Sequence, residues 1–413
     1  MSDRPVTSSW LRNGRLPDGR IVDIRVDDGL IGAVVEHAAQ AESTAGDDLQ
    51  GWLVLPAMAE PHAHLDKVLT AETVSNPAGD LDGAIAAWRA AAIAGRFTPD
   101  DVERRASTAL EMLLAHGVTA VRTHVNVTPE VGVVNLHVLD RVGSAFAGLI
   151  DLQIVALTSA PVTGAAGAEN RAILSAAIEA GVDIVGGCPH LDTDGAGGVA
   201  VAFDAAADAG LGIDLHTDET LDPGVLTLRD MARHVRDTGF EGLVAASHCV
   251  SLGVQPLTVQ RAVAAEVAVA GIAVFPLPQT NLYLQGRDTS TATPRGLTAL
   301  GPLHDAGALV AAGADNVQDP YNLVGRSDPL ETAALLVMAG HRSPDEAYAM
   351  VSNNARRAMG LPVVSFAAGD PADVVAIDAP SIRGAIADAP MSRRVYRRGR
   401  LVASVDQETT VHR

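Results

Sequence analysis

The sequence LVLPAMAEPHAHLDK, residues 53–67, joins an apolar run to two histidines that are two positions apart. The run itself, 53–59, has the continuous apolar character of a strand that is buried on both faces. Residues i and i+2 of a strand point to the same face, so His62 and His64 at its end can both face one point. This stretch therefore predicts a buried strand that ends in a candidate metal site.

Seven further apolar runs follow, separated by stretches of helical character. Buried strands that alternate with helices imply a parallel sheet, and eight such units close a (β/α)8 barrel. The interval between the first two runs exceeds one helix, so we expect a helical cap over the barrel mouth at 70–98 and a packing helix at 99–116. Ser343, Pro344 and Glu346 predict the start of a later helix, with a capping box. The eight runs are 53–59, 118–125, 149–157, 182–187, 211–216, 242–248, 271–277 and 308–315.

The two ends of the chain have the pattern of antiparallel strands. Polar and apolar residues alternate over 22–27, and the pair Asp28 and Gly29 precedes another apolar stretch, which is a β-hairpin signal. Residues 372–379 and 393–404 have strand character as well. We predict that both ends join in one small β-sandwich domain. The predicted parts are 1–54 and 363–413 for the β-sandwich and 55–362 for the barrel.

Composition limits the partners of this protein. A chain of 413 residues exceeds the roughly 250–300 residues at which one core stops growing. Its net charge of −20 repels phosphate backbones and anionic lipids, so we expect neither nucleic acid nor a membrane as partner. Only two cysteines occur, and the first residues, MSDRPVTSS, lack the pattern of a secretory signal. We expect a soluble cytoplasmic protein. The sequence leaves open whether it forms a homo-oligomer.

Three further ligand-type residues end other apolar runs. His216 ends the fifth run, His248 the sixth and Asp315 the eighth. A single histidine at a strand end is usually structural, but together with His62 and His64 these residues meet where barrel enzymes carry their active sites. Imidazoles and a carboxylate, with water completing the shell, suit one divalent metal ion, Zn²⁺ or Fe²⁺.

Other residues near the strand ends refine this hypothesis. Binuclear hydrolases with this barrel bridge two metals with a carbamylated lysine on the fourth strand. Lys67 is the only lysine in the chain and lies after the first run, so this bridge is excluded and one metal is favoured. His124 and His190 end the second and fourth runs and are open to a structural or a pocket-lining role. Glu219, three residues past His216, has the position of a proton shuttle, although a solvated loop carboxylate is an equal alternative.

Seven motifs, taken in this order, resemble the amidohydrolase superfamily and, within it, the bacterial cytosine deaminase group. They extend from residue 60 to about residue 325, and the β-rich ends are similar to the small sandwich of such proteins. The motifs are EPHAHLDK, VRTHVNV, GGCPHLD, DLHTDE, ASHCVSL, NLYLQGRDTSTATPRGLT and ADNVQDPYN.

The resemblance implies a mononuclear hydrolase. In such enzymes the metal lowers the pKa of its water, so that hydroxide exists at neutral pH. Asp315 would accept a proton from this water, His248 would hold the hydroxide, and Glu219 would protonate a ring nitrogen next to the carbon under attack. The implied metal ligands are His62, His64, His216 and Asp315.

Two departures from the cytosine deaminase pattern concern the substrate. Ser159 stands where these enzymes carry a glutamine that pairs with the pyrimidine, and Asn316 stands where cytosine deaminase resembles Asp-Asp. A site built to pair polar groups rejects a substrate that leaves them unpaired, so we expect a preferred substrate other than cytosine. Gln285, Arg287 and Tyr321 are further candidates for contacts with the substrate.

The leading hypothesis is hydrolytic deamination of a small heterocycle: an aminopyrimidine, aminopurine, pterin or aminotriazine. The alternative within hydrolases is cleavage of a cyclic amide or an N-alkylamine by the same mononuclear site. A different alternative is a non-catalytic binding protein on an inherited barrel. Such a protein would have lost metal ligands, whereas here the four implied ligands, Glu219 and His248 are all present. The zinc deaminases that act on nucleic-acid bases are excluded, because Cys188 and Cys249 cannot form their Pro-Cys-x-x-Cys pair.

Overall fold

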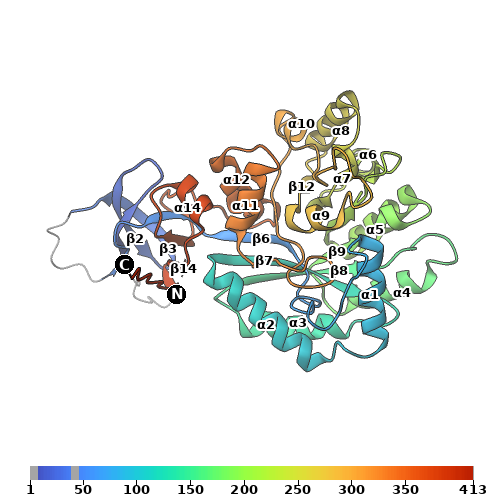
Figure 1. The fold of residues 1–413 in the computed structure, drawn as a ribbon, viewed down its shortest axis with the longest axis horizontal. Coiled ribbons are helices and arrows are strands. Elements are labelled where there is room, and N and C mark those ends of the chain that lie inside the picture. Colours follow the sequence, from blue (N-terminus) through green and yellow to red (C-terminus); the bar gives the residue numbers. More distant parts are fainter. Residues whose placement is uncertain (1–7, 39–45, 413) are drawn as a thin grey trace, which may run out of the picture.

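The computed structural model describes residues 8–38 and 46–412. Figure 1 shows a small sheet, built by strands from both ends of the chain, beside a larger barrel that is surrounded by helices. Among the described residues, no helix combines the length and the apolar character that crossing a membrane requires. The predicted fold class, a barrel with a small β domain from the two termini, is confirmed.

The small domain is one mixed sheet in the order β15-β14-β13-β5-β1-β2-β3, with β4 beside β1. The predicted hairpin joins β2 to β3, and Asp27 pairs with Leu30. Asp28 and Gly29 turn the chain with φ angles of 50° and 84°, which is the left-handed geometry that such turns require. The strands are β1 (Ser8–Arg15), β2 (Ile21–Asp27), β3 (Leu30–Glu36), β4 (Asp47–Asp48), β5 (Leu53–Pro56), β13 (Val374–Ile377), β14 (Arg393–Arg397) and β15 (Arg400–Val405).

The first apolar run is divided between the two domains, so the prediction of one barrel strand at 53–59 is wrong in its extent. Its first half is β5, which pairs with β13 in the small sheet. The backbone then changes partners: Ala57 donates to Asp373, whereas Met58 donates to Gly117 at the start of the barrel. Both halves are apolar and mostly buried, so hydrophobicity alone does not show where one strand ends and the next begins.

The barrel has seven parallel strands in the order β12-β11-β10-β9-β8-β7-β6. The eighth run, 308–315, forms no regular strand. It closes the barrel through two isolated parallel bridges, Val274 to Val310 on one side and Ala63 to Asp315 on the other. The strands are β6 (Met58–Ala63), β7 (Val118–Val127), β8 (Asp151–Thr158), β9 (Ile184–Gly187), β10 (Gly212–Thr217), β11 (Val244–His248) and β12 (Ala273–Phe275).

Helices surround the barrel, and two of them fill the interval between its first two strands. α1 (Leu81–Ile93) is the predicted cap, and α2 (Pro99–Ala115) is the predicted packing helix. α12 (Pro344–Met350) begins with the predicted capping box, in which Ser343 and Glu346 exchange hydrogen bonds. The other helices are α3 (Val134–Ala145), α4 (Ala168–Glu179), η1 (Pro189–Leu191), α5 (Gly195–Ala209), α6 (Thr227–Thr238), α7 (Val250–Gly253), α8 (Leu257–Val269), α9 (Pro278–Leu284), α10 (Leu300–Asp305), α11 (Pro329–Met338), α13 (Asn353–Ala358) and α14 (Ile382–Asp388).

A buried charge network connects the two domains. Arg356 of α13 donates to Asp373 at 2.8 Å and to Thr119 of β7 at 3.0 Å. Arg397 of β14 binds the same carboxylate. Arg356 and Asp373 are buried, so each charge depends on the others for compensation. This network fixes the small sheet against the end of the barrel opposite to the histidines.

Candidate active site

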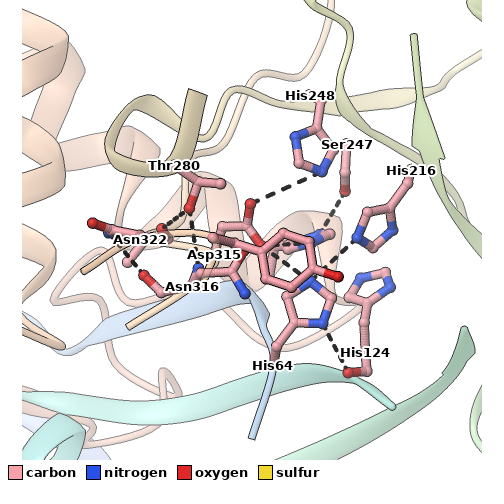
Figure 2. Close-up of polar contacts among 12 residues, drawn as sticks. His64, His124, His216, Ser247, His248, Thr280, Asp315, Asn316 and Asn322 are labelled. Atoms are coloured by element: carbon pink, nitrogen blue, oxygen red, sulfur yellow. Dashed lines mark hydrogen bonds and ion pairs between the residues drawn. The ribbon is translucent and has the colours of Figure 1, made fainter. Parts of the chain in front are cut away.

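Side chains from distant parts of the chain converge at the carboxyl ends of the barrel strands (Figure 2). His62 is the penultimate residue of β6, and His64 lies directly after that strand. His216 lies on β10 and Asp315 in the eighth segment. The Asp315 Oδ1 atom lies 3.0 Å from His64 Nε2 and 3.4 Å from His62 Nε2. His64 Nε2 and His216 Nε2 are 3.2 Å apart. The structure thus brings all four predicted metal ligands together.

His248 of β11 belongs to the same cluster. One ligand atom from each of His62, His216, His248 and Asp315 lies within 4.8 Å of the others. His248 Nε2 is 4.0 Å from Asp315 Oδ2. All of these side chains are buried, so they form a closed group rather than a solvated surface cluster.

Unpaired atoms in this cluster fit a divalent metal ion. His62 Nε2, His248 Nε2 and both carboxylate oxygens of Asp315 are buried without a hydrogen-bond partner in the described chain. Burial lowers the pKa of His64 and of His216, which favours the neutral imidazoles that metals bind. Buried lone pairs of this kind require a cation.

Hydrogen bonds on the far side of the histidine rings fix their tautomers. Ser247 Oγ donates to Asp214 Oδ1 at 2.9 Å, so it must accept from His62 Nδ1 at 2.8 Å. His64 Nδ1 donates to the carbonyl oxygen of His124 at 3.1 Å. Both rings therefore direct the lone pair of Nε2 toward Asp315. Such outer partners orient metal ligands and raise their basicity.

His248 has the opposite tautomer. Asn281 Nδ2 lies 3.2 Å from His248 Nδ1 and donates to it, so the proton of the ring is on Nε2. Burial lowers the pKa of His248 to about 3, and the ring is neutral. A neutral His248 that directs an N–H toward Asp315 is a hydrogen-bond donor for an oxygen at the metal site, as the resemblance implied.

The sequence did not predict Asp214, Arg122 or Ser247 in this network, and it left His124 open to a structural or a pocket-lining role. Asp214 ion-pairs with Arg122 at 2.8 Å and anchors Ser247. The ring of His124 stacks on that of His62 with a centroid distance of 3.9 Å. Asp214 precedes His216 by two residues on β10, and its i, i+2 spacing was a signal that could have placed it beside the metal ligands.

Glu60 positions the eighth segment. Its buried carboxyl group accepts from the backbone N–H of Ala314 at 3.0 Å and of His62 at 3.2 Å. These hydrogen bonds replace backbone bonds that a regular strand would make in the eighth segment next to Asp315. Burial raises the pKa of Glu60 to about 8, so this group is largely a neutral acid at pH 7.

Three non-glycine residues at the site have a left-handed backbone. Asp218, His248 and Asp315 have φ angles of 52°, 68° and 67°. Such conformations cost roughly 1–3 kcal/mol each and are concentrated at functional sites. The fold holds these residues in place, so the side chains of His248 and Asp315 are directed by backbone turns as well as by their strands.

Glu219 lies beside His248. Its Oε1 atom is 3.6 Å from His248 Nδ1, and the side chain is buried. Burial, together with the negative charge of Asp315, raises the pKa of Glu219 well above its ordinary value. The raised pKa favours the protonated form of Glu219, which is the form that can donate a proton.

A cavity of about 440 Å³ opens next to these groups. Ser159, Asn316 and Tyr321 line it, whereas Gln285 and Arg287 are not among its lining residues. Gln285 instead donates to the backbone of Glu219, and Arg287 stacks on the ring of Tyr283 at 4.5 Å. The apolar part of the lining includes Leu81, Ile85 and Trp88 of α1, Leu157 and Leu191.

Comparison with known proteins agrees with the fold. The model of the amidohydrolase family matches residues 69–403. A pterin deaminase of Rhizobium rhizogenes is 33% identical over 384 residues, which are 92% of this chain and 87% of the relative. The crystal structure of 5-methylcytosine deaminase from Klebsiella pneumoniae with 5-fluorocytosine has a TM-score of 0.88 at 30% identity and covers 98% of this chain and 99% of that chain.

A third comparison extends the range of chemistry. The crystal structure of N-isopropylammelide isopropylaminohydrolase from Burkholderia multivorans has a TM-score of 0.83 at 27% identity, and the match covers 96% of this chain and 98% of that chain. These matches extend over nearly the whole length of both partners. The chain belongs to the amidohydrolase family.

Proposed function

We propose that this chain is a metal-dependent hydrolase that deaminates a small nitrogen heterocycle and releases ammonia. The observation that carries the proposal is that the buried carboxyl group of Glu219, whose pKa is raised, lines the same cavity as His64, His216, His248 and Asp315. Similarity to the pterin deaminase and the 5-methylcytosine deaminase supports it. The net charge of −20 favours a small-molecule substrate over nucleic acid.

The proposed ligands would hold one divalent cation, Zn²⁺ or Fe²⁺. When bound, this ion lowers the pKa of a coordinated water, so that a hydroxide nucleophile is available at neutral pH. The ligands offer three imidazoles and one carboxylate, a donor set that suits either metal. They are His62, His64, His216 and Asp315.

Three side chains manage protons around the attacking oxygen. Asp315 keeps carboxylate oxygens available to accept a proton from the water. His248 donates a hydrogen bond from Nε2 to the attacking oxygen and orients it. Glu219 protonates the ring nitrogen next to the amine-bearing carbon, which makes that carbon electrophilic, and the departing amine leaves as ammonia after it gains a proton.

Polar groups on the cavity wall select the ring. Asn316 donates one N–H from Nδ2 to Asp319 Oδ2 at 2.7 Å, which leaves its side-chain carbonyl oxygen to accept from a substrate and its second N–H to donate. Ser159 and Tyr321 line the same space. A serine and an asparagine present a different set of donors and acceptors from the glutamine and aspartate of cytosine deaminases, which favours a substrate other than cytosine.

A second candidate function is hydrolysis of an N-alkylamine on the same kind of ring. The observation that favours it is the similarity to N-isopropylammelide isopropylaminohydrolase over 96% of the chain. The same nucleophile and the same proton donor would serve, with an alkylamine rather than ammonia as leaving group. Opening of a cyclic amide is the third reaction open to such a site.

The test is ammonia release by the purified, zinc- or iron-loaded protein. The panel contains pterins, cytosine, isocytosine, isoguanine, creatinine, aminotriazines and their N-alkyl derivatives. We expect ammonia from at least one amino-heterocycle. Alkylamine release, or a mass gain of one water without ammonia, would replace deamination by one of the two alternatives.

A further inference from the structure

Lys67 is a buried cation in the wall of the cavity. It lies in the turn after β6, three residues beyond His64, and only 3% of it is exposed. It lines the cavity together with Glu219 and Asn316. It is also the only lysine among the 413 residues of the chain.

This ammonium group lacks a polar partner in the described part of the chain. No carboxylate there comes within the 4.0 Å of an ion pair, and no side chain or carbonyl accepts a hydrogen bond from it. Its contacts are the faces of two aromatic rings, with Nζ 4.7 Å from the centre of Tyr321 and 5.9 Å from the centre of Trp88.

The second cation of the cavity wall differs in this respect. Arg89 of α1 pairs with Glu130 at 2.5 Å, and 64% of its side chain is exposed. Its charge is thus both compensated and hydrated. Among the described residues of the cavity wall, Lys67 is the cationic side chain that is buried and has no hydrogen-bond acceptor for its three donor hydrogens.

A buried ammonium of this kind is costly without an acceptor. Contact with an aromatic face stabilises a cation by about 0.5–2 kcal/mol, whereas the removal of a charge from water costs considerably more free energy. The hydrogen bonds of an ammonium require oxygen or nitrogen lone pairs, which the cavity lining does not supply to Lys67 in the described structure. A ligand that enters the cavity can supply them.

We propose that Lys67 binds an oxo oxygen on the heterocycle, and that the site therefore acts on amino-oxo rings, in which an amine and a conjugated oxo group are both present. This inference rests on the proposed function. When the nucleophile adds to the amine-bearing carbon, electron density moves through the ring to such an oxygen. A cation beside it stabilises the transition state more than the ground state, because the charge develops there.

Matched pairs of substrates test this role. The pairs are pterin with 2-aminopteridine and cytosine with 4-aminopyrimidine, in which the second member lacks the oxo group. We expect the wild type to prefer the oxo member in kcat/KM. Lys67→Met should lower kcat/KM for the oxo member by roughly 10- to 100-fold, which is the loss typical of a charged hydrogen bond. The kcat/KM for the member without the oxo group should change little. Lys67→Arg should retain part of the preference.

The outcomes separate this inference from the proposed function. Equal losses on both members of a pair in Lys67→Met would overturn the role of Lys67 and leave deamination standing. Absence of ammonia from every member of the panel would overturn deamination. Arg89→Gln is the charge control, because it removes a cation from the same cavity wall. In this variant the ratio of kcat/KM between the two members of a pair should stay that of the wild type.

The single lysine also gives a test that needs no turnover. Protein labelled with ¹⁵N,¹³C-lysine has one lysine side-chain signal, that of Lys67. Titration of the zinc-loaded protein with uracil and 2,4-dioxopteridine, which carry oxo groups and no amine, should shift the Cε and Nζ resonances. If neither ring shifts them, Lys67 does not bind ring oxygens. A shift without any ammonia release would retain the oxygen site and reject the deaminase.

Discussion

The Nδ1 atom of His62 lies 2.8 Å from the hydroxyl of Ser247, which in turn donates to the buried carboxylate of Asp214. This chain of hydrogen bonds decides which nitrogen of His62 faces the metal site. Arg122 completes it by neutralising Asp214 in the barrel interior. The same barrel core therefore both supports the fold and prepares a ligand for binding.

Removal of the Ser247 hydroxyl tests this relationship. Ser247→Ala leaves His62 in place but without its Nδ1 acceptor, so we expect roughly 10- to 100-fold weaker zinc binding in a folded protein. The measurement is a competition between the protein and a chromophoric chelator. Ser251→Ala is the control, because that hydroxyl donates to Val225 and contacts no ligand. Equal affinities of the two variants would rule out the relay.

Loss of a proposed ligand should have a larger effect. His216→Ala removes an imidazole from the centre of the cluster, so both the bound metal and the activity should be lost. Metal content by mass spectrometry of the purified protein gives the answer. His304→Ala is the matched change at an exposed position and should retain the full content. Stoichiometric metal in His216→Ala would remove this residue from the ligand set.

Glu219→Gln separates proton transfer from metal binding. The amide keeps the shape of the side chain but cannot donate an acidic proton, so kcat should fall by about 10²- to 10⁴-fold while the metal stays bound. The control is Glu130→Gln, which changes another carboxylate that lines the cavity. Near-normal turnover of Glu219→Gln would assign the proton to another group.

The rate should also depend on pH through Glu219. Burial and the charge of Asp315 raise the pKa of Glu219 well above its ordinary value, so the side chain loses its proton only as the pH rises through this raised pKa. We expect kcat to decline on the alkaline side of the profile. The residual activity of Glu219→Gln should lack this alkaline decline, and its persistence there would show that a different group titrates.

Stability should depend on the charge network between the domains. Asp373→Ala leaves Arg356 and Arg397 without their shared carboxylate in a buried place, which should cost about 3–5 kcal/mol in free energy of unfolding. Urea unfolding measures it. Glu266→Gln breaks the partly exposed pair with Arg229 and should cost less than about 1 kcal/mol. Similar losses in both variants would contradict the interpretation.

Local patterns in the sequence were sufficient for the barrel and for the main site residues. The alternation of apolar runs and helices predicts parallel strands, because strands covered on both faces must be apolar throughout. The position of His62, His216 and Asp315 at run ends then places them at one face, since parallel strands all point the same way. The capping box at Ser343 could be predicted because all of its partners lie within one turn of the helix.

Tertiary structure decided what depends on partners far away in the chain. The run at 53–59 is divided between two sheets because Ala57 and Met58 find different backbone partners. Ser247 fixes the tautomer of a histidine 185 residues away, and no local pattern records that pairing. Lys67 faces the cavity because α1 and Tyr321 close over it. The sequence by itself determined which chemistry is present and on which strands, whereas the closed barrel decided which atoms meet, because only long-range packing fixes distances between strand ends.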